Sequence, residues 1–182
     1  MRSRRSLPSL RRRANARGVT PVEAAIAFAI FGAILAVAVP AFIRELHGSR
    51  FVEPVSGLER MSAGAIAYAA SHPGANAFPE TAPLTPPVVP RARREVDPPN
   101  VWDTPSWKAL DFRAAPEGTP HAYAFGFTST PATPAAPSQF VAHAHGDLDG
   151  DGVTSTFEVR GHANAAGPAE QVPGMYVEAE LE

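Results

Sequence analysis

Cysteine is absent from all 182 residues of the chain. Without it the protein can form no disulfide bond, and it has no thiol to carry the lipid of a lipoprotein. The loops of any exported domain must therefore be held by other interactions.

Motifs of common enzyme sites are also lacking. The sequence contains no nucleophile elbow, no phosphate-binding glycine loop and no HExxH zinc motif. We therefore expect that the protein is not an enzyme. Lysine is nearly absent, since Lys108 stands beside fifteen arginines. Together with abundant alanine and proline, this is typical of GC-rich coding, so the preference for arginine carries no functional information.

A long apolar run near the N-terminus is the dominant feature. From Ala24 to Ile43, twenty consecutive residues carry no charge, and as a helix they would cover about 30 Å, the thickness of a hydrocarbon core. No acid precedes Glu23, and seven arginines do: Arg2, Arg4, Arg5, Arg11, Arg12, Arg13 and Arg17. The positive-inside rule then places the N-terminus in the cytoplasm and the chain after Arg44 outside.

Three residues predict where the helix begins. Thr20 is placed as the N-cap, Pro21 at the first helical position, and Glu23 three residues after the cap. In such a capping box the Thr20 hydroxyl accepts from the Glu23 amide, and the Glu23 carboxylate accepts from the Thr20 amide.

The helix is expected to continue outward as far as Ser71. Apolar and small residues recur there at intervals of three and four, as on one packed helix face: Phe51, Val55, Leu58, Ser62, Ala65 and Ala69. Pro40, Pro54 and Gly57 interrupt the run, so we expect a long, bent helix that ends before the turn at Ser71 to Gly74.

The N-terminal segment resembles the prepilin signature of type IV pilins and type II secretion pseudopilins. Members of that family carry a basic leader that ends in glycine, a residue that becomes the methylated N-terminus, and a glutamate five residues after the glycine. A long apolar helix follows, with an internal glycine and a proline near its end. The matching residues are Gly18, Val19, Thr20, Glu23, Gly32 and Pro40.

The resemblance implies how the chain is processed. A prepilin peptidase would cleave after Gly18 and Val19 would be methylated, after which an inner-membrane assembly platform would build subunits into a filament. Glu23 would then pair with the freed amine of Val19 on a neighbouring subunit. The protein would be a single-pass inner-membrane protein with a cytoplasmic N-terminus, and later part of a periplasmic or cell-surface filament of its own copies and other pilins or pseudopilins.

The choice between a pilus and a secretion pseudopilus stays open, as does that between motility, adhesion, DNA uptake and secretion. Two alternatives involve no filament. A conventional signal peptide would be cut after the small residues Ala36 and Ala38, and a plain membrane anchor would keep residues 2–18 attached. Either would fit a secreted or membrane-anchored calcium-binding protein that does not polymerise.

The expected fold is α+β, with the long helix packed on a small antiparallel sheet as in type IV pilins. We divide the chain into a leader (1–18), an assembly half of the helix (19–43), a periplasmic half (44–72), a proline-rich loop (73–100) and a globular domain (101–182). Alternating apolar residues predict four strands: Ala122 to Ser129, Gln139 to His143, Thr156 to Arg160 and Met175 to Glu180.

Seven prolines between Phe78 and Pro99 make regular structure unexpected there. The arginines of this segment, Arg91, Arg93 and Arg94, fit either a solvated loop or a contact with acidic neighbours. Four large residues that follow are interpreted as core, with a surface for sugar or receptor binding as the alternative: Trp102, Trp107, Leu110 and Phe112.

The run GDLDGDGVTSTFE, from Gly146 to Glu158, fits the twelve-residue calcium-loop pattern. Asp147, Asp149, Asp151, Val153, Ser155 and Glu158 occupy positions 1, 3, 5, 7, 9 and 12, with Val153 contributing a carbonyl and Ser155 acting through water. Because the flanks read as strands, we predict a calcium-binding turn in a sheet. The alternative is a simple Asp-Gly hairpin turn.

Two further features bear on partners. His143 and His145 flank one alanine and would share a strand face, where they could bind zinc or be ordinary surface histidines. Without the seven arginines before Val19, nine basic residues remain against eighteen acidic ones. A mature formal charge near −9 argues against nucleic acid as a partner, because phosphate binding needs clustered Lys and Arg.

Overall fold

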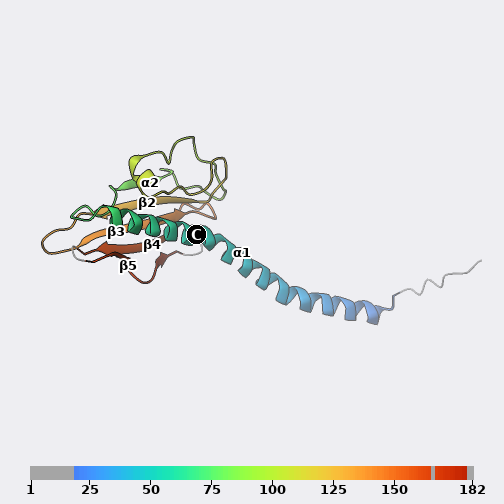
Figure 1. Ribbon diagram of the computed structural model, residues 1–182. Coiled ribbons are helices and arrows are strands. Elements are labelled where there is room, and N and C mark those ends of the chain that lie inside the picture. Colours follow the sequence, from blue (N-terminus) through green and yellow to red (C-terminus); the bar gives the residue numbers. More distant parts are fainter. Residues whose placement is uncertain (1–18, 165–166, 180–182) are drawn as a thin grey trace, which may run out of the picture. The chain divides into compact units, whose positions relative to one another are not determined.

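The computed structural model describes residues 19–164 and 167–179, with the backbone alone for 43–50. The predicted leader, including Gly18, lies outside these residues. The described chain forms two units that meet between Arg44 and Glu45, and each is treated on its own. The first holds the N-terminal part of helix α1 (Pro21–Ser71), and the second holds its remainder and all strands (Figure 1).

Helix α1 begins and ends where the sequence predicts. The Thr20 amide donates to Oε2 of Glu23 at 2.8 Å, and the Glu23 amide donates to Oγ1 of Thr20 at 3.2 Å. These two bonds are the reciprocal capping box, which satisfies two of the amides that a helix start leaves unpaired. The helix continues through Pro40 and Pro54 and ends at Ser71.

In the second unit α1 packs on a six-stranded antiparallel sheet (Figure 1). Strands β1 to β5 are neighbours in sequence order, and β6 pairs with the same edge of β4 as β5 does. Their bounds are β1 Ala82–Thr85, β2 Tyr123–Thr130, β3 Ser138–Gly146, β4 Ser155–Ala163, β5 Ala169–Gln171 and β6 Tyr176–Glu178.

The four predicted strands are confirmed as β2, β3, β4 and β6, and the α+β layout of an apolar helix followed by a small antiparallel sheet is also confirmed. The expectation that the proline-rich segment has no regular structure is wrong, because β1 lies within it and pairs with β2. β1 is the edge strand of the sheet, where a residue such as Pro83, which has no N–H to donate, is tolerated. Strand β5 was also not predicted.

The core lies between α1 and one face of the sheet. The predicted helix stripe is buried at Leu58 and Ala65, both fully inaccessible. The predicted core residues after the proline-rich segment are confirmed, at exposures of 5% or less: Trp102, Trp107, Leu110 and Phe112. Trp107 lies in the short helix α2 (Pro105–Ala109), and its Nε1 donates to Oγ1 of Thr85 in β1 at 3.1 Å.

Two glycines let α1 approach this core closely. A Cβ on Gly57 would collide with the ring of Phe125, and one on Gly64 would collide with the backbone carbonyl of Leu110. A ring can shift more easily than a backbone carbonyl, so Gly64 is the position where the helix has least freedom to accept a side chain.

We therefore predict that Gly64→Ala destabilises the domain by about 1–3 kcal/mol, the usual cost of overpacking. The melting temperature, followed by circular dichroism on the full-length protein in detergent, should fall accordingly. Gly32→Ala is the matched control, because Gly32 lies in the same helix with no other atom within 4 Å of an added Cβ. Equal melting temperatures for the two variants would show that the close approach at Gly64 is wrong.

Candidate functional site

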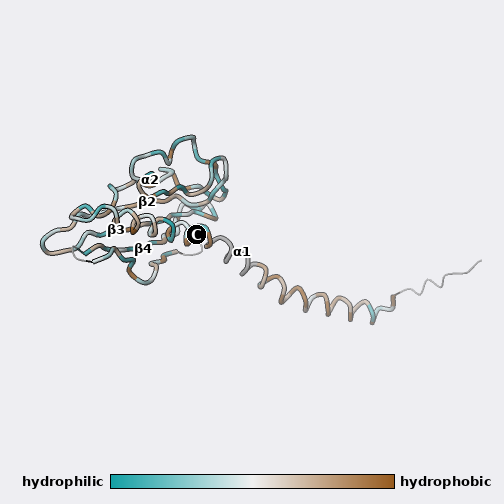
Figure 2. Tube along the Cα trace, viewed as in Figure 1, coloured by the Kyte–Doolittle hydropathy of each residue, from teal (hydrophilic) through white to brown (hydrophobic). Residues whose placement is uncertain are grey.

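The N-terminal part of α1 is an apolar surface that is exposed within the described part of its unit. Pro21–Phe42 is the one helix in residues 19–164 and 167–179 that is long and apolar enough to cross a membrane. Figure 2 shows its predominantly apolar colouring. Segments of this kind span a bilayer or act as signal sequences.

The predicted assembly residues lie along this segment. Val19 is 74% exposed, and the Glu23 carboxylate bonds Thr20 through Oε2. Gly32 has open space around it, and Pro40 is an exposed residue within the helix. The structure therefore places a carboxylate at the start of the apolar segment and a small residue near its middle.

The second candidate is the acidic turn, defined here as Asp147 to Asp151 between β3 and β4. One oxygen from each of Asp147, Asp149 and Asp151 lies within 4.8 Å of the others. Gly150 and Gly152 give the backbone its tight path, with φ angles of 85° and 96° that favour glycine. Three carboxylates are the hard oxygen ligands that Ca²⁺ and Mg²⁺ prefer.

Hydrogen bonds within the turn orient its carboxylates. Asp147 accepts from the amides of Gly150 at 2.7 Å and Gly152 at 3.2 Å, one through each oxygen. Asp149 accepts from the Asp151 amide, and Asp151 from the Val153 amide. Asp147 is only 1% exposed, so its buried charge depends on these donors. The other two aspartates are exposed and keep oxygens free for a cation.

The other predicted ligands, Val153, Ser155 and Glu158, follow the acidic turn in sequence. Val153 is exposed, and the Ser155 hydroxyl is buried and donates to the Gly146 carbonyl at 3.1 Å. Glu158 lies in β4 and accepts from Arg160 at 3.0 Å. β4 begins at Ser155, and an extended strand rises about 3.3 Å per residue. Glu158, at position 12 of the pattern, therefore lies along β4 and away from the acidic turn.

Arg91 was predicted in a loop, but not beside the acidic turn. Its Nε lies 3.5 Å from Oδ2 of Asp147, and the Ala92 amide donates to the Asp147 carbonyl at 2.8 Å. The Arg91 side chain is 67% exposed, so it can move away from Asp147 at little cost in free energy. No short-range sequence pattern predicts a contact between two segments that are so far apart in the chain.

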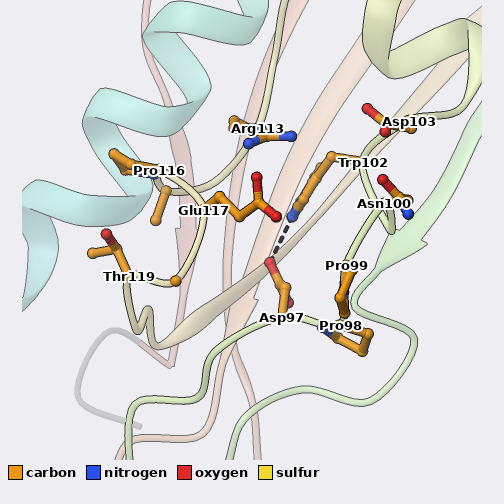
Figure 3. Close-up of a pocket in the computed structure, with 12 residues that line it drawn as sticks. Asp97, Pro98, Pro99, Asn100, Trp102, Asp103, Arg113, Pro116, Glu117 and Thr119 are labelled. Carbon is orange, nitrogen blue, oxygen red and sulfur yellow. Dashed lines mark hydrogen bonds between the residues drawn. The ribbon is translucent and has the colours of Figure 1, made fainter.

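A small cavity beside Trp102 is shown in Figure 3. Oδ2 of Asp97 accepts from Nε1 of Trp102 at 2.6 Å and lies 2.7 Å from Nε2 of His121. The other nitrogen of His121 bonds the Tyr123 carbonyl at 2.8 Å, so both imidazole nitrogens are hydrogen-bonded within the domain. The volume of about 70 Å³ suits a few waters, whereas ligand pockets usually exceed about 300 Å³.

Comparison with known proteins gives no relative for this chain. No family model, no curated protein and no solved structure matches it. Two features of its own residues therefore carry the functional argument, namely the exposed apolar segment Pro21–Phe42 and the acidic turn.

The hydrogen bonds of the turn lead to a prediction. Asp147→Ala removes a buried carboxylate that accepts from two amides, and a hydrogen bond to a charged group is worth about 1.5–3 kcal/mol. Urea unfolding should show this loss. Asp149→Ala, which removes one exposed acceptor, is the matched control and should cost clearly less. If both variants unfold at the same urea concentration, Asp147 does not hold the turn.

Proposed function

We propose that the protein is a structural subunit of a type IV pilus-like filament, a pilin or a pseudopilin, and not an enzyme. The observation that carries this proposal is the exposed apolar segment Pro21–Phe42. Its first turn contains Glu23, whose carboxylate caps the start of the helix. The membrane would cover this segment before assembly, and the filament would cover it afterwards.

The exposed area argues that this segment needs a cover. Burying one large apolar side chain is worth about 1.5–3 kcal/mol, so a segment with many of them is not stable in water alone. The large apolar side chains that are exposed here are Val22, Ile26, Phe28, Ile30, Phe31, Ile34, Leu35, Val37, Val39 and Phe42. A lipid bilayer would cover them before assembly, and the helices of neighbouring copies after it.

Glu23 favours assembly over simple anchoring. A carboxylate taken into hydrocarbon costs about 2.5–3.5 kcal/mol on insertion scales unless a cation meets it. Cleavage after Gly18 would free the amine of Val19, which is four residues from Glu23 in sequence and exposed. On a neighbouring copy this amine would be the matching charge, and the pairing would set the register between subunits.

Small residues on the same segment would let helices approach closely, as at other membrane-helix interfaces. They are Ala25, Ala29, Gly32, Ala33 and Ala36. The open space at Gly32 leaves this part of the helix free to receive a neighbour.

Processing is the first test of the proposal. The intact mass of the mature protein should correspond to a start at Val19 carrying one methyl group, because the peptidase of the pilin family cuts after the leader glycine. A start near Val39 would mean a conventional signal peptide instead. An intact leader would mean a plain membrane anchor, and either result would contradict the proposal.

Glu23→Ala is the second test. The variant should reach the membrane, yet be lost from sheared filaments by at least about tenfold, which corresponds to only about 1.4 kcal/mol of lost pairing energy. Glu59→Ala is the matched control, because Glu59 lies exposed on the same helix in the second unit. Normal incorporation of the Glu23 variant would contradict the proposed pairing.

We propose further that the acidic turn binds calcium outside the cytoplasm. Asp147, Asp149 and Asp151 would supply carboxylate oxygens, and the bound ion would relieve the repulsion between their charges. Calcium would then order the turn of a domain that has no disulfide to do so. A calcium-binding protein that never polymerises is the alternative that this turn by itself favours.

Calcium at about tenfold above its dissociation constant should stabilise the protein by about 1.4 kcal/mol. Thermal unfolding of the full-length protein with calcium and with chelator measures this. The double variant Asp149→Asn, Asp151→Asn should lose the effect, because asparagine keeps the amide bonds of the turn and removes the charge. Asp103→Asn with Asp111→Asn removes equal charge elsewhere and should keep it. A calcium effect that survives in the turn variant would contradict this site.

A further inference from the structure

We infer that His143 and His145 form a chelating site for a divalent transition metal of the zinc class, on the face of the sheet opposite to α1. The site is separate from the acidic turn and does not depend on filament assembly. It uses two imidazoles from one strand, and the arrangement of the neighbouring strands around them carries the argument.

Strand β3 sends its side chains to the two faces in turn. Ala142 and Ala144 are fully inaccessible and face the core beneath α1. The residues between and after them must face the other way, because successive side chains alternate along a strand. His143 and His145 therefore share the outer face, where both are half-buried.

The two rings lie close enough to share one ion. Their centroids are 5.3 Å apart, at an interplanar angle of 54°. Zinc sits about 2.0–2.1 Å from each imidazole nitrogen, so two nitrogens of a tetrahedral site lie roughly 3.3 Å apart. A nitrogen lies about 1 Å from its ring centre, so nitrogens facing each other across this centroid distance would lie about 3 Å apart, close to that spacing.

Neighbouring strands leave a nitrogen of each ring available. Nδ1 of His145 lies 3.0 Å from Oγ1 of Thr156, the residue directly opposite on β4. When this nitrogen donates to the hydroxyl, Nε2 keeps its lone pair, and such outer hydrogen bonds are typical of metal-binding histidines. His143 has no hydrogen-bond partner among the described residues. Its Nε2 edge packs over Gly126 of β2, where a Cβ would collide with the ring, and Nδ1 is not among the atoms nearest that glycine.

Charged groups also lie beside the pair. Burial, with the nearby His145 as a second cause, lowers the pKa of His143, and Glu158 acts in the opposite sense. Glu158 lies directly opposite His143 on β4 and is bonded to Arg160 at 3.0 Å. Its carboxylate lies beside the pair with Arg160 as its ion-pair partner, and water can fill the remaining coordination positions.

Ligand chemistry separates this site from the acidic turn. Imidazole suits zinc, copper and nickel, whereas carboxylates without nitrogen donors suit calcium and magnesium. The two sites should therefore fill independently, with calcium in the turn and a transition metal on the sheet face.

The test is calorimetric titration of the full-length protein in detergent with Zn²⁺, in the presence of excess Ca²⁺ to occupy the acidic turn. His143→Asn and His145→Asn should each weaken binding at least about tenfold, since each removes one of two ligands. His162→Asn is the matched control, because His162 lies on the same face at the far end of β4, opposite Gln139, and should bind as the original protein does.

A second measurement covers the case that a histidine variant folds poorly. The spectrum of bound Cu²⁺ in electron paramagnetic resonance should show coupling to two imidazole nitrogens in the unaltered protein. Absence of Zn²⁺ binding, coupling to a single nitrogen, or binding that disappears only in the Asp149→Asn, Asp151→Asn variant would overturn the proposal.

Discussion

The constraint on which the functional account depends is an apolar helical segment that the described residues leave exposed. From Pro21 to Phe42 the side chains are exposed almost without exception, and hydrophobic surface of this extent is not left in water. A carboxylate at the start of the segment, fixed by Thr20, distinguishes it from a uniform anchor. In the proposed function, membrane insertion followed by packing against other copies would accommodate both the apolar area and the charge.

The second unit shows how a domain without cysteine fixes its long connections. Polar contacts join segments that are remote in sequence. Glu53 on α1 accepts from the amides of Ala122 and Tyr123 at 2.7 and 3.1 Å. Asp97 joins Trp102 to His121, and Arg91 reaches the acidic turn. In each of these contacts a donor in one segment is paired with an acceptor in another. They therefore stabilise the proline-rich segment without a covalent link.

Sequence patterns predicted the elements that depend on interactions between residues close together in the chain. The capping residues Thr20 and Glu23 predicted the start of α1, and alternation of Tyr123, Phe125 and Phe127 predicted β2. Strand β1 was missed because it lies among prolines, and β5 because its residues, Ala169–Gln171, show no apolar alternation. Pairing with a longer strand creates both. The calcium-loop pattern located the three aspartates of the acidic turn, but it could not show that pairing of Ser155 with Gly146 starts β4 before Glu158.

The most direct test of the account is disulfide cross-linking through the apolar segment, in cells that carry the assembly machinery. Because the chain has no cysteine, a single cysteine placed in turn at each position from 24 to 41 can pair only with another molecule. The account predicts cross-linked copies at positions that recur with helical spacing, and none for the control Ala63→Cys on the exposed side of α1 in the second unit. No cross-link at any position, or a mature protein that lacks the segment, would contradict it.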